Sequence, residues 1–471
     1  MVFSSAIFLF YFFPVFLLVY LASPVRYKNA VALVGSLLFY LWGAPKFIVL
    51  LLASIAVDFY LGNGIYYTEN KRVRRQLLGL GVTLNVALLA YFKYANFFVA
   101  NFNRGLQELG FSAVEWTAVA LPIGISFFTF QKLSYLIDLY YRKAEPLERL
   151  ANYALYIILF PQLIAGPIVR FKEIADQIRE RRANLTTDNK LNGIFRFVVG
   201  LSKKVLIADT LGQQVDLAFS NGLAEMGTYD AWIILLAYAM QIYYDFSGYS
   251  DMAIGIGLML GFRLPENFNF PYISRSITEF WRRWHITLSN WMRDYLYIPL
   301  GGNRKGVYRT YFNLVVVFLI SGLWHGAAWS FVFWGAFHGA FLILDRLFLQ
   351  RVLDRIGLLP ALLFTFFITL LGWVLFRTES LSLSIDYYQL LFAGEVSTLE
   401  MNKQFWFTLF LASGIAIIPG LLRQEERLNS VFQSVDTRST LTKAFFSLLL
   451  LLLCFSQVEV SNFNPFIYFR F

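Results

Sequence analysis

The three histidines of the chain, His285, His325 and His338, all lie in one stretch that runs from residue 262 to 339. The ordinary pKa of histidine is about 6.5, so a neutral imidazole can take a proton from an attacking hydroxyl near neutral pH. In a chain this rich in apolar residues, ionisable groups at the membrane are expected to act there. We therefore expect residues 262–339 to hold the chemistry, with histidine as a general base.

His325 is the strongest candidate for that base. It stands in the sequence Leu-Trp-His-Gly at 323–326, inside a hydrophobic segment. Gly326 leaves room for a substrate to approach the backbone, and Trp324 can shape a dry pocket. The alternative is a packed histidine that is hydrogen-bonded between helices, as in most isolated cases. Composition leaves both interpretations open.

Neither of the other two histidines can contact His325 through the geometry of a single helix. His338 follows it by 13 residues, which in a continuous helix means a rise of ~20 Å and a different face. We therefore expect His338 to pack, and His285 to reach His325 only through tertiary folding. The chain has no H-E-x-x-H motif and no third histidine or glutamate at ligand spacing, so no metal site is expected.

The stretch from 277 to 295 predicts the helix that positions His285. Apolar side chains recur there at three- and four-residue steps, and His285 lies on their stripe. Ser276 and Glu279 form a capping-box pattern, which predicts that the helix begins there. Tryptophans on the stripe and arginines opposite are typical of a helix at the membrane surface, with its tryptophans in the interface. His285 is then directed away from bulk water.

Composition sets the frame for these residues. The chain has 471 residues, of which 58% are hydrophobic, and a mean hydropathy of +0.56, which indicates an all-α polytopic membrane protein. The net charge of +10 is better explained by basic cytoplasmic loops than by nucleic acid. The single cysteine, Cys454, excludes an internal disulfide. Residues 1–21 have no basic start and no cleavage site, and predict a first membrane helix rather than a signal peptide.

Hydrophobic segments predict about 10 to 13 membrane spans. Some segments are short or contain Gly and Pro, as at 160–167, and predict re-entrant pieces. The predicted spans lie at roughly 4–22, 30–43, 46–66, 77–99, 117–140, 151–168, 191–210, 229–260, 311–328, 330–348, 358–376, 404–421 and 443–458.

The distribution of charge predicts the orientation of these spans. Basic residues cluster in the loops around 71–75, 142–149 and 346–355, which predicts that those loops are cytoplasmic, whereas the acidic loop 377–403 fits the outside. Both termini are then expected outside. No separate soluble domain is visible, so we expect one membrane domain over 1–471.

Polar groups within the predicted spans have two interpretations each. Asp245 and Asp251 either belong to a buried polar network, where glycines allow close helix approach, or form the polar wall of a substrate passage. Lys203 and Lys204 could hold an anionic donor, although a cytoplasmic anchor at the lipid surface is the favoured interpretation.

Motifs along nearly the whole chain carry a resemblance to a known family. They are Met-Val-Phe-Ser-Ser at 1–5, Leu-Pro-Ile-Gly-Ile-Ser-Phe at 121–127, Phe-Pro-Gln-Leu-Ile-Ala-Gly-Pro at 160–167, Thr-Glu-Phe-Trp-Arg-Arg-Trp-His at 278–285, Arg-Asp-Tyr-Leu-Tyr-Ile-Pro-Leu-Gly-Gly at 293–302, Leu-Trp-His-Gly at 323–326 and Asn-Pro-Phe-Ile-Tyr-Phe-Arg-Phe at 464–471. With them the chain resembles the membrane-bound O-acyltransferase (MBOAT) superfamily and, within it, the bacterial alginate O-acetyltransferase membrane-protein type.

The resemblance implies a ring of helices with re-entrant and interfacial helices around a central funnel, and acyl transfer within the membrane. The family's near-invariant histidine falls on His325 and its second functional histidine on His285, within the catalytic core 262–339. The form of 297–302 favours acetyl over D-alanyl transfer. No bound cofactor is implied, and acetyl-CoA is the expected donor substrate.

The resulting hypothesis gives each residue a role. His325 is the general base on the acceptor hydroxyl or on an intermediate nucleophile, and His285 orients donor or acceptor. Trp324 and Asp245 are candidates for the substrate pore. Asn303 and Arg304 could contact a donor phosphate, with a solvated turn as the alternative. No serine lies in a G-x-S-x-G elbow.

The expected surroundings and the alternatives complete the hypothesis. The expected partners are a periplasmic SGNH-hydrolase-like acetyltransferase, a polysaccharide acceptor and membrane lipids, with no nucleic acid. The acceptor could be alginate, cellulose, another exopolysaccharide or peptidoglycan, and the acyl group could be D-alanyl or longer than acetyl. A transporter without chemistry is the alternative from another class, because broken spans and glycines also suit transport.

Overall fold

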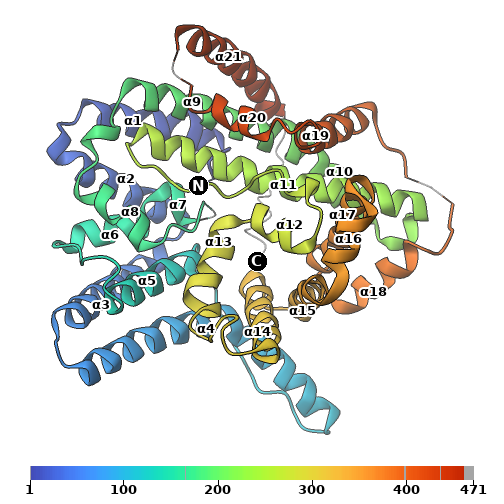
Figure 1. The fold of residues 1–471 in the computed structure, drawn as a ribbon, viewed down its shortest axis with the longest axis horizontal. Helices are drawn as coiled ribbons and strands as arrows, with labels where there is room; N and C mark the ends of the chain where they lie inside the picture. The colour runs from blue at the N-terminus through green and yellow to red at the C-terminus, as the bar shows by residue number, and fades with distance from the viewer. Residues whose placement is uncertain (1, 165, 397–398, 435, 461–471) are drawn as a thin grey trace. The chain divides into compact units, whose positions relative to one another are not determined.

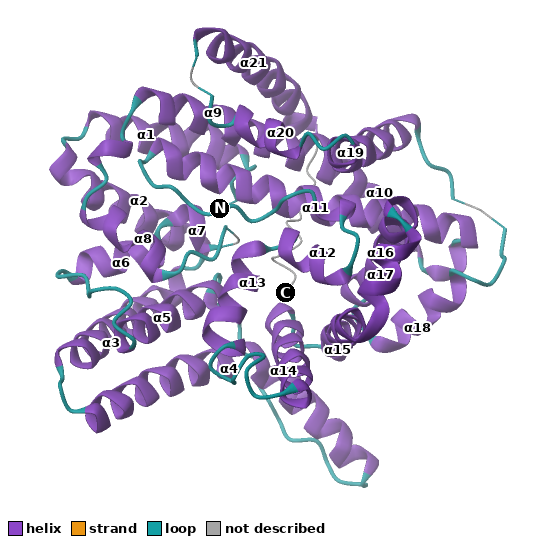
Figure 2. Ribbon diagram, in the orientation of Figure 1, coloured by secondary structure: helices purple, strands orange, loops and turns teal. Residues whose placement is uncertain are grey.

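The computed structural model describes residues 2–164, 166–396, 399–434 and 436–460. Within these ranges helices are the only regular secondary structure and no strand is present (Figure 2). The prediction of an all-α protein is therefore confirmed. The motif at 464–471 lies outside the described residues.

The chain divides into two compact units. The first contains Ile7–Leu185 and Leu260–Leu264, and the second contains Thr186–Met259, Pro265–Phe471 and the short segment Phe3–Ala6. All three histidines belong to the second unit. The expectation of a single membrane domain over 1–471 stays a prediction.

The first unit is built around a buried ion pair. Lys132 Nζ lies 2.9 Å from Asp58 Oδ2, and Asn85 donates to the other carboxylate oxygen over 2.8 Å. Pairing of this kind is what allows charges to be buried between apolar helices. The label η marks short 3₁₀ or π helices. The helices of the unit are η1 (Ile7–Phe12), α1 (Phe13–Ala22), η2 (Val25–Tyr27), α2 (Lys28–Gly43), η3 (Pro45–Phe47), α3 (Ile48–Tyr67), α4 (Lys71–Glu108), α5 (Ile125–Tyr140), α6 (Leu150–Ile158), α7 (Phe160–Leu163), α8 (Phe171–Arg179) and η4 (Arg182–Asn184).

The second unit is built around α11 (Thr228–Met259), a helix of 32 residues with a length of ~48 Å. It packs against α9, α10, α17 and α19 (Figure 1). Most of its residues are buried. The unit's other helices are α9 (Thr187–Ser202), η5 (Lys203–Ala208), α10 (Asp209–Asn221), η6 (Leu223–Glu225), η7 (Pro271–Ile273), α12 (Ile277–Arg283), α13 (Ile286–Met292), η8 (Arg293–Tyr297), α14 (Val307–His325), α15 (Trp329–Leu344), η9 (Asp345–Leu349), α16 (Gln350–Ile356), α17 (Leu358–Arg377), α18 (Leu381–Leu390), α19 (Lys403–Leu421), α20 (Glu425–Val431) and α21 (Thr437–Val460).

Glycines bring α9 and α11 into backbone contact. A Cβ added at Gly200 would lie 2.5 Å from the carbonyl oxygen of Gly248, and one added at Gly193 would lie 2.6 Å from that of Gly255. Small residues at such positions let two helices approach closely enough to pack through their backbones. The predicted close approach around the acidic residues of α11 is therefore confirmed.

Seven helical segments of the described chain are long and apolar enough to cross a membrane, and this makes it a multi-pass membrane protein. Ile7–Ala22 is a shorter apolar helix. The predicted total of 10 to 13 also counted broken segments such as 151–168, where α6 stops at Ile158, and it stays a prediction. The seven segments are Pro45–Tyr67, Lys71–Glu108, Val307–His325, Trp329–Ile356, Leu358–Arg377, Lys403–Leu421 and Thr437–Gln457.

Candidate active site

The helix predicted over 277–295 begins where expected but is broken at His285. Ser276 Oγ accepts from the Glu279 backbone N–H over 3.1 Å, which confirms the predicted N-cap. The prediction of one continuous helix is wrong, because α12 ends at Arg283 and α13 begins at Ile286. His285 between them has a left-handed backbone, with φ of 43° and ψ of 53°.

A loop that precedes α12 explains the break. The backbone N–H of Asn269 donates to the carbonyl of Arg283 over 2.9 Å, and that of Ile286 donates to the carbonyl of Asn267 over 2.9 Å. Backbone groups that a continuous helix would pair internally are thus paired with this loop. A left-handed backbone is costly for a residue with a Cβ, so the surrounding bonds must hold it.

Side chains of this segment point into the protein core. His285 is 0% exposed, which confirms that it is directed away from water. The tryptophans were predicted to lie in the membrane interface, and this is wrong for Trp281 and Trp284, which are also buried. Trp284 packs edge-on against Phe268 with 5.0 Å between ring centroids. Aromatic partners inside the unit therefore replace the lipid interface.

Tertiary folding brings His285 to His325. His325 is the last residue of α14 and is 2% exposed, and the centroids of the two imidazole rings are 6.4 Å apart. The Trp324 ring lies 6.0 Å from that of His285 and 4.9 Å from that of His325. Three residues predicted for the site therefore meet in one buried cluster.

Aromatic rings enclose the two histidines. The ring of His325 contacts Trp334 at 5.0 Å and Phe376 at 5.2 Å, and the ring of His285 contacts Phe246 at 4.7 Å. Such a wall excludes water and strengthens electrostatic interactions inside it. Burial lowers the pKa of His285, which lies outside the apolar spans, to about 3. This histidine is therefore neutral at physiological pH.

A close helix contact positions His325. α14 and α15 lie side by side, and a Cβ added at Gly322 would lie 2.2 Å from the Phe331 carbonyl oxygen. A Cβ at Gly335 would lie 2.3 Å from the carbonyl oxygen of Phe318. Glycine at both positions permits this approach, which sets the end of α14 where His325 stands.

A family model matches most of the chain. The model of the membrane-bound O-acyltransferase family matches residues 73–356, a range that includes all three histidines. The chain belongs to this family. It is therefore an O-acyltransferase.

Three relatives carry the names of enzymes that transfer an acyl group. A probable alginate O-acetylase of Pseudomonas aeruginosa is 45% identical over 86% of this acyltransferase and 77% of the relative. A peptidoglycan O-acetyltransferase of Helicobacter pylori is 39% identical, and the match covers 81% of this chain and 78% of the relative. A teichoic acid D-alanyltransferase of Bacillus subtilis is 29% identical, and the match covers 47% of this chain and 58% of the relative.

His338 lies behind the site of the acyltransferase. Trp334 stands between it and His325, with ring centroids 5.0 Å from each. His338 is 0% exposed, and neither of its ring nitrogens has a hydrogen-bond partner among the described residues. The arrangement agrees with a packing role. The continuous helix assumed between the two histidines is absent, since α14 ends at His325 and α15 begins at Trp329.

Asp245 belongs to a buried ion cluster. Lys204 Nζ lies 2.7 Å from Asp245 Oδ1 and 2.6 Å from Asp209 Oδ1. The buried-network interpretation of Asp245 therefore describes its contacts. The lipid-anchor interpretation of Lys204 is wrong, because its side chain is only 2% exposed. Phe246, the next residue on α11, contacts the His285 ring, so the cluster supports the wall of the site.

Asp251 lines a cavity whose wall also includes Asn267, a residue that contacts His285. Lys203 and Arg196 pair with Asp251 over 2.6 and 2.9 Å. The cavity has a volume of about 300 Å³, and its wall includes these three residues, Glu266 and Asn267. The oxygen of the Asn267 side chain lies 3.0 Å from His285 Nδ1. The polar-wall interpretation therefore suits Asp251 better than Asp245.

Asn303 and Arg304 lie elsewhere, on an exposed turn between η8 and α14. Gly301 and Gly302, with φ of 111° and 55°, form the turn, and the Arg304 N–H donates to the Gly301 carbonyl over 3.2 Å. The structure does not gather these two residues with the histidines in any contact between described side chains. Their role with a donor phosphate stays a prediction.

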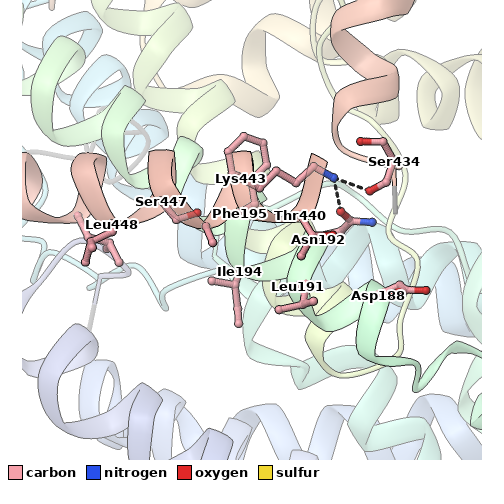
Figure 3. A pocket seen from close by; sticks show the side chains of 12 residues that line it. Asp188, Leu191, Asn192, Ile194, Phe195, Ser434, Thr440, Lys443, Ser447 and Leu448 are labelled. Carbon is pink, nitrogen blue, oxygen red and sulfur yellow. Dashed lines mark hydrogen bonds between the residues drawn. The ribbon is translucent and has the colours of Figure 1, made fainter. Parts of the chain in front are cut away.

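A second cavity lies between α9 and α21, and no histidine lines it (Figure 3). Lys443 Nζ donates there to Asn192 Oδ1 over 2.5 Å and to the Ser434 carbonyl over 2.6 Å. This cavity is therefore separate from the histidine site. Among the described residues no group of three or more His, Cys, Asp or Glu side chains could hold a metal ion.

Proposed function

We propose that this acyltransferase moves acetyl from a cytoplasmic thioester donor, acetyl-CoA, toward an exported polysaccharide, with alginate as the first candidate. The name of the Pseudomonas aeruginosa relative supports acetyl as the group and alginate as the polymer. The protein works in the bacterial inner membrane with both termini in the periplasm. A periplasmic SGNH-hydrolase-like partner places the acetyl group on the polymer.

The observation that carries the proposal is the buried His285–His325 pair, whose ring centroids are 6.4 Å apart inside an aromatic wall. His325 takes the proton of the attacking group, which is the acceptor hydroxyl or an intermediate nucleophile, as that group attacks the thioester carbonyl carbon. The carbon–sulfur bond then breaks, and the thiolate leaves with the proton from the imidazolium. His285 orients one of the two substrates.

Peptidoglycan is the second candidate acceptor, because a relative with that name is 39% identical over most of both chains. D-alanyl transfer is less well supported, since the relative of that name matches only 47% of this chain. Family membership favours chemistry over transport alone.

The test is release of free thiol from acetyl-CoA by purified protein in nanodiscs. Wild type is compared with His325→Ala, and with His338→Ala as a matched control that removes another buried imidazole of the same unit. We expect turnover to vanish in His325→Ala and to persist, per folded molecule, in His338→Ala. Equal turnover in wild type and His325→Ala would remove His325 from the chemistry.

The acceptor is tested in the same assay. Alginate or peptidoglycan fragments are added together with the periplasmic partner, and acetyl on the polymer is measured by mass spectrometry. Acetylated alginate supports the proposal. Acetylation of peptidoglycan alone would replace it with the second candidate.

A further inference from the structure

Asn267 is a buried amide that contacts the second histidine of the active site. It lies between α11 and α12 and is 1% exposed. Its Oδ1 is 3.0 Å from His285 Nδ1 and accepts from the Thr287 hydroxyl over 2.8 Å and from the Thr287 backbone N–H over 3.3 Å. Its Nδ2 donates to Ser250 Oγ over 3.1 Å. Both ends of the amide are thus engaged.

These bonds decide which nitrogen of His285 carries the proton. A backbone N–H can only donate, so the atom that faces Thr287 N is the oxygen of Asn267. The same oxygen faces His285 Nδ1, so Nδ1 is protonated and donates. A neutral imidazole has one protonated nitrogen, and Nε2 therefore bears the lone pair. The backbone bond from Ile286 N to the Asn267 carbonyl fixes the ring's position against the loop.

We propose that Asn267 is a positioning residue for acyl transfer: it holds His285 in the Nδ1–H tautomer, so that Nε2 accepts a hydrogen bond from the bound substrate. The substrate group is an N–H or O–H other than the hydroxyl that His325 deprotonates. His285 in this tautomer cannot donate from Nε2 to the thioester carbonyl. The inference deepens the proposed function and rests on the part that it gives His285.

A charge introduced at position 267 should have a measurable effect on the protonation of His285. The rings and side chains that face it are Phe246, Trp324, Asn267, Thr287 and His325. Among these contacts His325 is the ionisable side chain, and Arg196, Lys203, Asp251 and Glu266 line the cavity that Asn267 borders. A carboxylate introduced at 267 would therefore act directly on the protonation of His285 and raise its pKa.

The first test observes the tautomer directly. Because the chain has three histidines, protein labelled with heavy nitrogen in histidine alone gives three resolvable imidazoles by NMR, and His285→Gln assigns one of them. We expect an Nδ1–H signature for His285 in wild type, its retention in Asn267→Asp, and its loss in Asn267→Leu. An Nε2–H signature in wild type would overturn the proposal.

The second test measures thioester turnover. In Asn267→Leu we expect kcat to fall at least ~10-fold at matched folding, because small misplacements of a positioning group are costly in rate. In Asn267→Asp we expect much of kcat to return above pH 7 and the acidic limb of the pH–rate profile to move to higher pH. Asn192→Leu removes a buried amide of the same unit away from the site, and its profile should match wild type.

The outcomes separate the inference from the proposed function. Unchanged kcat in Asn267→Leu, or a wild-type pH profile in Asn267→Asp, would overturn the positioning role. Full turnover in His285→Ala would instead overturn the role of His285 in the proposed function. The NMR result does not depend on turnover, so it decides the tautomer in either case.

Discussion

The imidazole rings of His285 and His325 lie edge to face, 6.4 Å apart between centroids, although His285 stands in the break between α12 and α13 and His325 ends α14. Two local features produce this relationship. The break between α12 and α13 turns His285 inward, and the glycine contact between α14 and α15 fixes the end of α14. The pair therefore depends on backbone geometry as much as on the imidazoles themselves.

Gly322→Ala should damage both stability and activity. Its Cβ would meet the Phe331 carbonyl at 2.2 Å, so α14 and α15 must separate. Overpacking of this kind costs about 1–3 kcal/mol, and it displaces His325. We expect a lower Tm and reduced thiol release per folded molecule. Gly339→Ala is the control on the same helix pair, since its Cβ would lie 3.3 Å from Phe318 Cβ and no closer than 3.8 Å to the facing backbone. Equal losses in both variants would contradict the prediction.

The free energy of unfolding should depend on pH partly through His285. Burial lowers its pKa to about 3 from the ordinary histidine value of 6.5, so the unfolded chain binds more protons between these values. The free energy of unfolding should therefore fall as pH drops below 6.5, by at most about 1.4 kcal/mol per pH unit, and be unaffected by this group above it. Thermal unfolding of wild type and His285→Gln from pH 4 to 8 isolates the effect as their difference. A constant difference would exclude it.

His338→Ala should lose stability and keep its activity. The ring packs against Trp281, Trp334 and Phe337 and is fully buried. Truncation of a buried ring leaves a cavity, and we expect a loss of about 2–4 kcal/mol. Turnover should persist in the fraction that elutes as folded protein by size exclusion. A well-folded but inactive variant would show that His338 does more than pack.

Lys204→Met should be strongly destabilising. It leaves Asp209 and Asp245 buried without their cation, and breaking such a cluster typically costs about 3–5 kcal/mol. Lys203→Met is the matched control: its side chain is 24% exposed, and Asp251 keeps Arg196. We expect a much larger drop in Tm for Lys204→Met. Comparable drops would mean that the Lys204 cluster contributes no more to stability than the partly exposed Lys203–Asp251 pair.

The sequence by itself determined the class of the protein and the identity of its main candidates. Apolar composition and basic loops indicated a polytopic membrane protein, because a bilayer selects for both. The motif at 323–326 singled out His325 and Trp324, and the pattern at 276–279 located the start of α12. Each of these predictions depends on composition or on residues that are close together in the chain, and both can be read from the sequence.

Only the tertiary structure decided which polar groups meet. Helical periodicity could not show the break at His285, because the loop that pairs with its backbone lies upstream in the chain. Asn267 was missed for the same reason, since nothing in its local sequence points to a histidine. Lys204 resembled a lipid anchor in the sequence because its ion pair with Asp245 of α11 forms only in the folded chain. Burial and pairing are set by contacts between segments that are far apart in the chain. The periodicity of one segment does not indicate those contacts.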